Sequence, residues 1–461
     1  MDITAKNMPT RNTAVYNKLA ALFDEGTFAE FDAYQSLSDT LAGVVCGYGS
    51  VDCQLVFAFA QDEETEKGAM DTVSANKIAA LYEKAIRCGA PVVGIYASAG
   101  SKITEGTSAA SALGKLMKAM SRASGIIPQI AVIDGNCSGL AASAAAMSDV
   151  IIASKNAKYY VNPPIVLRKA GVEGAGSVES AAKSGIIDIV CDSTEEAVLT
   201  ARKVLSLLPQ NNNTGSVYAG EDDPERDSAA IADAKDAREI LSAVCDSGSF
   251  VEFKKDCGSA VIGLAPIGSL VAGVVATDGG NITSADARKI ASFVSFCDSF
   301  CIPVVTFVNS TGVEACDESA PIATDLAKLA MAYGSSDCAK ITVITGKAYG
   351  AAFTVLGSKS LGADLVLARE SAEISIMAPD AAVQFLFGEE IKADANPAEH
   401  RKELTEKWIE SNASALGAAK NGDVDLIVSD AELRARVASA LQMLWTTGDG
   451  SILKKHSKLP F

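Results

Sequence analysis

The sequence is poor in histidine: only two of its 461 residues, His400 and His456, are of this type. A Ser-His-Asp hydrolase or a histidine-ligated metal hydrolase needs imidazole groups within its fold, so both classes are disfavoured. No two cysteines have the two-residue gap of a zinc ribbon, and the nearest pair is Cys297 and Cys301. We therefore expect no metal site, and we expect main-chain groups to carry much of any chemistry.

Long apolar runs and an excess of positive charge are also missing. No uninterrupted apolar run reaches the ~18 residues that a membrane span needs, and the opening segment MDITAKNMPTRN lacks the apolar core of a signal peptide. The 40 basic and 57 acidic residues give a net charge of −17, which disfavours binding to nucleic acid or to an anionic membrane. With eleven scattered cysteines, these features predict a reduced, cytoplasmic protein.

What the sequence does contain is a long internal repeat. Five pairs of segments match, always in the same order: 21–31 with 243–253, 89–100 with 301–312, 127–141 with 338–352, 149–153 with 364–368, and 184–197 with 421–434. Chance rarely produces five matches in register. We therefore expect two copies of one domain, at 1–215 and 228–461, joined by the polar, turn-rich linker 216–227.

Within each copy, short β-branched runs alternate with longer segments of helical period. The runs 91–95, 130–133 and 150–153 are bounded by Gly, Pro or Asp, which is typical of buried strands. The segments 75–88 and 110–123 repeat apolar residues along one helical face. This alternation predicts an α/β layer fold.

Small-residue turns follow a strand at two equivalent places in each copy. The first pair is 98–100 and 310–312, and the second pair is 135–141 and 346–352. A helix that starts at such a turn offers unpaired N–H groups and the positive end of its dipole. These groups suit an oxyanion hole for a thioester or ureido oxygen. The alternative interpretation is that small residues simply allow helices and sheet to pack closely.

The motifs at these turns resemble those of one enzyme family. SAGSKITEG (98–106) resembles that family's SGGARIQEG, GNCSGLAA (135–142) its GPCAGGAV, and KAYGAAF (347–353) its KAYGGAY, while 362–383 resembles the strand pair that follows. Over nearly its whole length the chain resembles the carboxyltransferase subunit of biotin-dependent acyl-CoA carboxylases, of the propionyl-CoA carboxylase β and decarboxylase α type. The resemblance implies tandem crotonase-like (ClpP/crotonase) domains, that is, a duplicated ββα superhelix.

The resemblance also implies a reaction that needs no histidine. Carboxylate moves between carboxybiotin and the α-carbon of an acyl-CoA, through an enolate held by backbone oxyanion holes. Biotin is the cofactor, carried by a separate protein, and acyl-CoA is the substrate. Carried over by position, the catalytic residues are Gly139 and Leu140 in copy one and Gly350, Ala351 and Ala352 in copy two; acyl-CoA contacts come from Ala99, Gly100, Ser101, Lys102 and Ser138, and biotin contacts from Gly312, Tyr349 and Phe353.

The expected partners follow from the same resemblance. They are a biotin carboxyl carrier protein and either biotin carboxylase or the membrane subunits of a decarboxylase. In the family the site lies between copy one of one subunit and copy two of another, so we expect dimers assembled into a homohexamer. Neither the acyl group nor the direction is specified: the α subunit of a sodium-pumping methylmalonyl-, malonyl- or glutaconyl-CoA decarboxylase remains open. Because Leu140 replaces a family glycine, a non-catalytic scaffold that binds CoA or carrier also remains open.

Several other residues have an alternative function and a plainer one. Ser138 lacks the Gly-x-Ser-x-Gly context of a nucleophile, so we expect a turn residue. Lys118 lies in a Met-Lys-Ala-Met segment of helical period and is expected on a helix surface, Glu105 is expected to be solvated rather than an acid/base, and Cys137 is expected in the core. The basic segment 454–456 is expected to contact CoA or a neighbouring subunit, or to be solvated.

Overall fold

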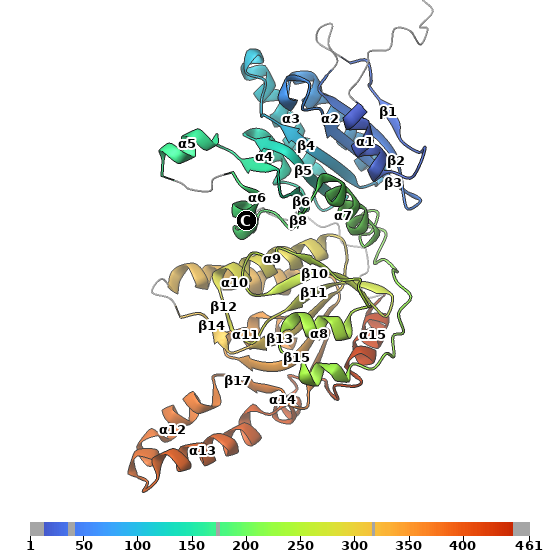
Figure 1. Ribbon diagram of the computed structural model, residues 1–461. Coiled ribbons are helices and arrows are strands. Elements are labelled where there is room, and N and C mark those ends of the chain that lie inside the picture. Colours follow the sequence, from blue (N-terminus) through green and yellow to red (C-terminus); the bar gives the residue numbers. More distant parts are fainter. Residues whose placement is uncertain (1–12, 36–41, 172–175, 316–318, 446–461) are drawn as a thin grey trace, which may run out of the picture. The chain divides into compact units, whose positions relative to one another are not determined.

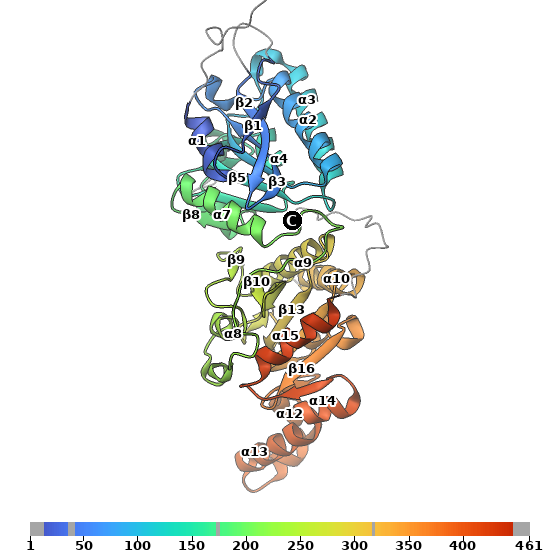
Figure 2. The same cartoon turned by 90° about the vertical axis from the view of Figure 1, so that its right-hand side faces the viewer.

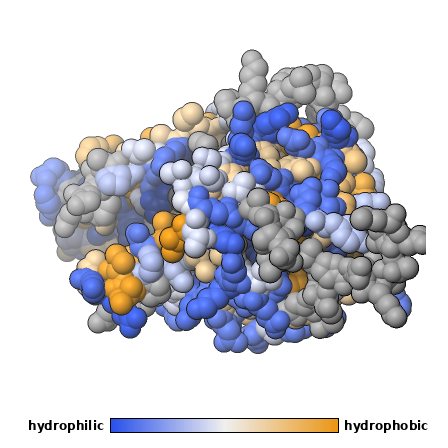
Figure 3. All heavy atoms as spheres, turned by 90° about the horizontal axis from the view of Figure 1, so that it is seen from above, coloured by the Kyte–Doolittle hydropathy of each residue, from blue (hydrophilic) through white to orange (hydrophobic). Residues whose placement is uncertain are grey.

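The computed structural model describes residues 13–35, 42–171, 176–315 and 319–445. The chain divides into two compact units, with the boundary between Thr214 and Gly215. Within the described ranges, no helix is both long enough and apolar enough to cross a membrane. The face seen in Figure 3 carries mainly hydrophilic residues with small apolar patches between them.

The first unit is built on one mixed sheet with helices around it (Figure 1). The strand order is β1-β2-β3-β4-β5-β6-β8, and the short β7 pairs with the end of β5. Strands β1, β2 and β3 are antiparallel, and the pairs from β3 onward are parallel. Its elements are α1 Thr13–Leu22, β1 Ala29–Phe31, β2 Val44–Val51, β3 Gln54–Gln61, α2 Thr72–Cys88, β4 Val92–Ser98, α3 Thr107–Ala123, β5 Gln129–Ser138, α4 Leu140–Ala145, β6 Val150–Ser154, β7 Lys158–Tyr160, α5 Pro164–Lys169, α6 Val178–Lys183, β8 Ile189–Cys191 and α7 Thr194–Ser206.

The second unit repeats this plan. Its strand order is β9-β10-β11-β13-β15-β16-β18, and the short β17 pairs with the end of β15. Its elements are α8 Ala237–Val244, β9 Val251–Phe253, β10 Val261–Ile267, β11 Leu270–Ala276, β12 Asn281–Ile282, α9 Ser284–Ser299, β13 Val304–Ser310, β14 Gly312–Val313, α10 Ser319–Ser335, β15 Lys340–Tyr349, α11 Ala351–Val355, β16 Leu365–Arg369, β17 Glu373–Ser375, α12 Pro379–Ala393, α13 Pro397–Trp408, α14 Ala415–Asn421, β18 Leu426–Val428 and α15 Leu433–Leu444.

Helices cover the two sheets in the same way. In the first unit α2 and α3 lie side by side, and Figure 2 shows its sheet between this pair and the pair α1 and α7. In the second unit α9 and α10 form the equivalent pair (Figure 1). The segments 75–88 and 110–123 lie in α2 and α3, and the three expected strand runs lie in β4, β5 and β6. The duplicated α/β layer fold that the sequence predicts is therefore confirmed.

A pattern of hydrogen bonds made by an arginine side chain repeats as well. On α7, Arg202 donates from Nη1 to the carbonyl of Leu22 at 2.7 Å and from Nη2 to Asp24 at 2.9 Å. On α15, Arg434 donates from Nη1 to the carbonyl of Val244 and from Nη2 to Asp246, the latter at 2.8 Å. The Asp24 and Asp246 segments are among the five matching pairs, so the repeat extends to individual side-chain bonds.

The expected linker segment is paired along the second unit. The N–H of Val271 donates to the carbonyl of Val217 at 2.9 Å, and the N–H of Ala219 donates to the carbonyl of Ser269 at 2.8 Å. These bonds hold residues 217–219 against the turn between β10 and β11. Polar composition alone does not show that a segment will bond in this way.

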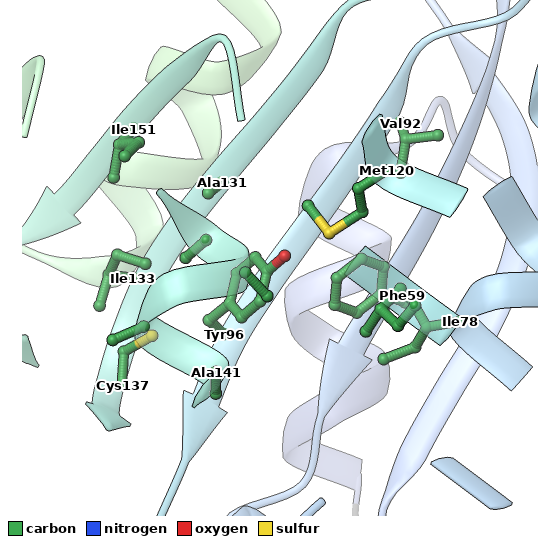
Figure 4. Close-up of a cluster of buried hydrophobic side chains, with 14 of the residues drawn as sticks. Phe59, Ile78, Val92, Tyr96, Met120, Ala131, Ile133, Cys137, Ala141 and Ile151 are labelled. Atoms are coloured by element: carbon green, nitrogen blue, oxygen red, sulfur yellow. The ribbon is translucent and has the colours of Figure 1, made fainter. Parts of the chain in front are cut away.

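The hydrophobic core of the first unit includes the end of β5, from which the small-residue turn to α4 begins. Phe59, Tyr96 and Met120 lie in this cluster, together with Cys137 at the end of β5 and Ala141 in α4 (Figure 4). Both Cys137 and Ala141 are buried. The turn between them is therefore held on both sides by packed residues.

Candidate active site

The first candidate turn connects β5 to α4. Gly139 has φ 61° and ψ −132°, a backbone conformation that glycine adopts without strain and other residues rarely adopt. Its N–H donates to the carbonyl of Tyr160, the last residue of β7, at 3.0 Å. The next N–H, that of Leu140, begins α4 and has no acceptor among the described residues. Leu140, rather than Gly139, therefore presents the available donor.

The second candidate turn, between β15 and α11, has the same construction. Gly350 has φ 56° and ψ −130°, and its N–H donates to the carbonyl of Ser375, the last residue of β17, at 2.9 Å. Ala351 begins α11, is exposed, and its N–H likewise finds no acceptor in the described ranges. Ala352 is fully buried. In each unit the first residue of the helix thus offers an unpaired N–H at an equivalent position, where the helix dipole adds a positive potential.

The loops that follow β4 and β13 lie beside these turns. In both units the parallel ladder is interrupted at the same place, between Tyr96 and Ser98 and between Val308 and Ser310. Such bulges bend a strand and re-aim the residues after it. Gly100 and Ser138 are brought together, because a Cβ on Gly100 would lie 3.3 Å from the Ser138 carbonyl oxygen.

Three N–H groups in each of these loops have a partner within the same unit. In the first unit Ala99 donates to the carbonyl of Lys67 at 3.0 Å, Gly100 to Ser98 Oγ at 3.1 Å and Lys102 to the carbonyl of Met70 at 2.9 Å. In the second unit Thr311 donates to the carbonyl of Gly280 at 3.3 Å, Gly312 to Ser310 Oγ at 3.4 Å and Glu314 to the carbonyl of Ile282 at 3.0 Å. The loops are therefore fixed by an equivalent set of bonds, whereas the N–H groups of Leu140 and Ala351, at the neighbouring helix starts, have no acceptor among the described residues. Ser101 is half-buried and forms a bridge with Met70.

Two side chains that the sequence analysis did not single out support the strands entering the turns. Glu63 accepts the N–H of Asn136 at 3.3 Å, and a Cβ on Gly135 would lie 1.8 Å from Glu63 Oε1. Asn309 accepts the N–H of Lys347 at 3.0 Å, and a Cβ on Gly346 would lie 2.5 Å from Asn309 Oδ1. These two side chains come from different elements, so the internal repeat of the sequence does not predict their contacts.

Lys102 and Glu105, on the loop before α3, each have a protein partner. Lys102 Nζ lies 2.8 Å from Glu66 Oε2, and this hydrogen bond raises the pKa of Lys102. Glu105 accepts both the N–H of Thr72, at 2.8 Å, and its hydroxyl, at 2.6 Å. The expectation that Glu105 is simply solvated was wrong, because its carboxylate satisfies the start of α2.

Tyr349 lies within the fold of the second unit. The residue is 4% exposed, and its hydroxyl donates to Glu373 on the neighbouring β17. Burial, followed by the carboxylate of Glu373, raises the pKa of the Tyr349 hydroxyl. Phe353 and Gly312 are half-buried. Contact of these three residues with biotin stays a prediction.

Ser138 has none of the surroundings of a nucleophile. It is buried, and its hydroxyl donates to the carbonyl of Ser98 at 3.3 Å. His400, the one histidine within the described ranges, lies on α13 of the other unit. The turn-residue interpretation of Ser138 is therefore the better one.

The remaining plain interpretations also hold. Lys118 is exposed on α3, and Cys137 is buried, which raises the pKa of its thiol. The basic segment 454–456 lies outside the described residues.

Comparison with known proteins gives one consistent result. A family model described as the carboxyl transferase domain matches residues 7–459. The chain is 33% identical over 470 residues to the propionyl-CoA carboxylase carboxyltransferase subunit of Haloferax mediterranei, covering 95% of this chain and 91% of that protein. It is 31% identical over 476 residues to the methylmalonyl-CoA decarboxylase α subunit of Veillonella parvula, covering 96% and 92%.

Among solved structures, the chain is similar to transcarboxylase 12S. That protein was solved as a hexamer assembly with methylmalonyl-coenzyme A and methylmalonic acid bound. The TM-score is 0.91 at 31% sequence identity, and the match covers 97% of this chain and 92% of the other.

Proposed function

The chain belongs to the carboxyl transferase family, and from this premise we propose that its two equivalent turns form a pair of oxyanion sites for carboxylate transfer. The resemblance stated from its motifs and its crotonase-like fold are confirmed. The chain is a carboxyltransferase of the biotin-dependent acyl-CoA carboxylase type. The residues that act, the acyl group, the direction and the partners are the substance of the proposal.

One observation carries the proposal: the first N–H of α4 and the first N–H of α11 are left unpaired at matching positions. Leu140 in the first unit would donate to the thioester oxygen of an acyl-CoA as the enolate forms. Ala351 in the second would donate to the ureido oxygen of biotin. A preorganised donor of this kind lowers a barrier by about 3–4 kcal/mol. Gly139 and Gly350 supply the backbone conformation that sets these donors in place.

The residues of the second turn fit a biotin ring. Ala351 is exposed and small, so a planar ureido group can approach its N–H closely. When bound, biotin supplies the carboxylate and a ureido nitrogen able to accept a proton from the substrate α-carbon. The Ser375 carbonyl accepts the N–H of Gly350, and Asn309 accepts the N–H of Lys347 in the strand before it, so the Ala351 donor stays fixed while charge develops. The expected carrier of this biotin is a separate biotin carboxyl carrier protein.

A paired assembly is supported by exposed apolar residues beside both turns. Ile376, directly after the β17 residue that accepts from Gly350, is 81% exposed, and Met377 beside it is also exposed. Val161, directly after the β7 residue that accepts from Gly139, is exposed too. Large apolar side chains at such places are typical of surfaces that another chain covers. We propose that a second copy covers them, in dimers that form a hexamer like that of transcarboxylase 12S.

The direction of carboxylate transfer depends on the partner subunits rather than on the two turns. The enolate is common to both directions, and the relatives include carboxylase and decarboxylase subunits. We propose a short acyl-CoA, such as acetyl- or propionyl-CoA, and a biotin carboxylase partner. A cytoplasmic setting is supported by the cysteines, none of which forms a disulfide within the described ranges. Copurification with membrane subunits would favour the decarboxylase instead.

Transfer to free biotin tests the proposal. The full-length protein is incubated with malonyl-CoA or methylmalonyl-CoA and free biotin, and loss of the acyl-CoA carboxylate is measured. We expect biotin-dependent decarboxylation of at least one of the two. CoA binding without turnover of either would contradict the proposal and favour the scaffold.

A further inference from the structure

Leu140 differs from the rest of α4 in both size and exposure. The helix reads LAASAA, and Leu140 is its only residue larger than serine. Ala141, Ala142, Ala144 and Ala145 are buried, whereas Leu140 is 40% exposed. The core therefore does not account for a leucine at this position, since alanine would serve the helix equally well.

The position of Leu140 places its side chain beside its own donor. In an α-helix each Cα–Cβ bond tilts toward the N-terminus, which is also the direction in which the first N–H groups point. Gly139 adds no side chain, and nothing lies within 4 Å of the point where its Cβ would be. An oxygen bound to the Leu140 N–H thus has the leucine side chain as its bulky neighbour, while the main chain of Ser138 lies against Gly100.

The second unit shows the same turn with a small residue. Ala351 occupies the position of Leu140, begins the equivalent helix and is exposed. The fold therefore tolerates alanine here. At the residue whose N–H donates, the first turn carries the isobutyl side chain of Leu140 and the second turn carries the methyl group of Ala351.

From this placement we infer that Leu140 is a specificity-determining residue, which limits the chain to acyl-CoA thioesters with short acyl groups. The inference rests on the proposed function, because it assigns the thioester to the first unit. The α-carbon of the acyl group is one bond from the carbonyl carbon whose oxygen the Leu140 N–H would hold. The acyl carbon atoms beyond the α-carbon must therefore pass beside the Leu140 side chain, and a longer acyl chain would clash with it.

Acyl selectivity in a Leu140→Ala variant tests the inference. Carboxylate transfer to free biotin is measured with malonyl-CoA and with butylmalonyl-CoA, which differ only in the substituent on the α-carbon. In the variant we expect the ratio of kcat/KM, butylmalonyl-CoA over malonyl-CoA, to rise by about tenfold or more, as for other pockets that discriminate by methylene groups. An unchanged ratio would overturn the inference, whether or not both rates fall together.

Two matched variants separate pocket shape from general effects. Leu199→Ala removes an exposed leucine on α7, away from the turn, and Ala351→Leu adds the same side chain at the second turn. Leu199→Ala should leave the acyl ratio of transfer unchanged, and Ala351→Leu, which would crowd biotin, should leave the ratio of acyl-CoA dissociation constants unchanged; a ratio shifted as in Leu140→Ala would contradict the assignment. The ratio of the dissociation constants of acetyl-CoA and hexanoyl-CoA measures the same discrimination by acyl length without turnover. An inactive wild-type protein would thus overturn the proposed function, while the binding ratio still decides the inference.

Discussion

The N–H of Gly139 donates to the carbonyl of Tyr160 at 3.0 Å, so the strand after the turn fixes the glycine from which α4 begins. The equivalent bond in the second unit fixes Gly350. Each glycine is therefore occupied as a donor, and the residue that follows it is not. The free donor therefore lies one residue after each glycine, at Leu140 and Ala351, and this position determines which substitutions should slow transfer.

Leu140→Pro should strongly slow carboxylate transfer while the protein still folds. Proline is well tolerated as the first residue of a helix, where its missing N–H has no intrahelical partner. Gly139, at ψ −132°, lies outside the helical region that a following proline disfavours. We expect kcat to fall by about 10²–10³. Leu140→Ala keeps the N–H and should retain turnover of malonyl-CoA; equal activity in the two variants would reject Leu140 as donor.

Ala351→Pro should affect the biotin half of the reaction. The change removes the corresponding N–H at the start of α11. We expect transfer to fall by about 10²–10³, with the dissociation constant of acyl-CoA unchanged. Binding is measured by calorimetry and transfer by loss of the acyl-CoA carboxylate. Ala351→Gly keeps the donor and serves as the control, and a weakened acyl-CoA affinity in Ala351→Pro alone would assign the thioester to the second unit.

Removing the two repeated arginines should destabilise the units unequally. The side chain of Arg434 is 0% exposed and that of Asp246 is 3% exposed, so Arg434→Met leaves a buried carboxylate without its cation. We expect a loss of about 3–5 kcal/mol in the free energy of unfolding. Arg202→Met, at a more exposed pair, should lose about 1 kcal/mol or less. Urea denaturation of both variants measures this difference, and equal losses would contradict it.

Acid should weaken the first unit partly through Asp24. The N–H of Cys53, then Arg202 and the Ser50 hydroxyl, hold the pKa of Asp24 well below its usual range. Because the pKa is lower in the folded state, this stabilisation is present above the ordinary value and is lost as the pH falls below it. Asp24→Asn should therefore lower Tm at neutral pH and flatten its decline in acid. Thermal melts across this range measure the slope, and a slope as steep as that of the wild type would exclude Asp24.

Much of the fold could be predicted from the sequence because the repeat and the strand runs are local signals. The segments 75–88 and 110–123 needed only their apolar period to be recognised as helices. The turns were located because Gly139 and Gly350 follow buried strands in both copies. Resemblance to a family with matching motifs then supplied the reaction.

The bonds that decide which atom can act could not be predicted. Gly139 meets Tyr160 only because β7 folds back onto the end of β5, and Gly350 meets Ser375 for the same reason. Glu105 was misjudged because its partner Thr72 is distant in sequence and adjacent only in the fold. Such pairings depend on tertiary contacts that no residue spacing records.

The most direct measurement is a structure of the full-length protein with a short acyl-CoA bound. We predict the thioester oxygen at a hydrogen-bond distance of about 2.9 Å from the Leu140 nitrogen, with the acyl carbons beside the Leu140 side chain. A thioester oxygen held at Ala351, or one that contacts neither turn, would contradict it.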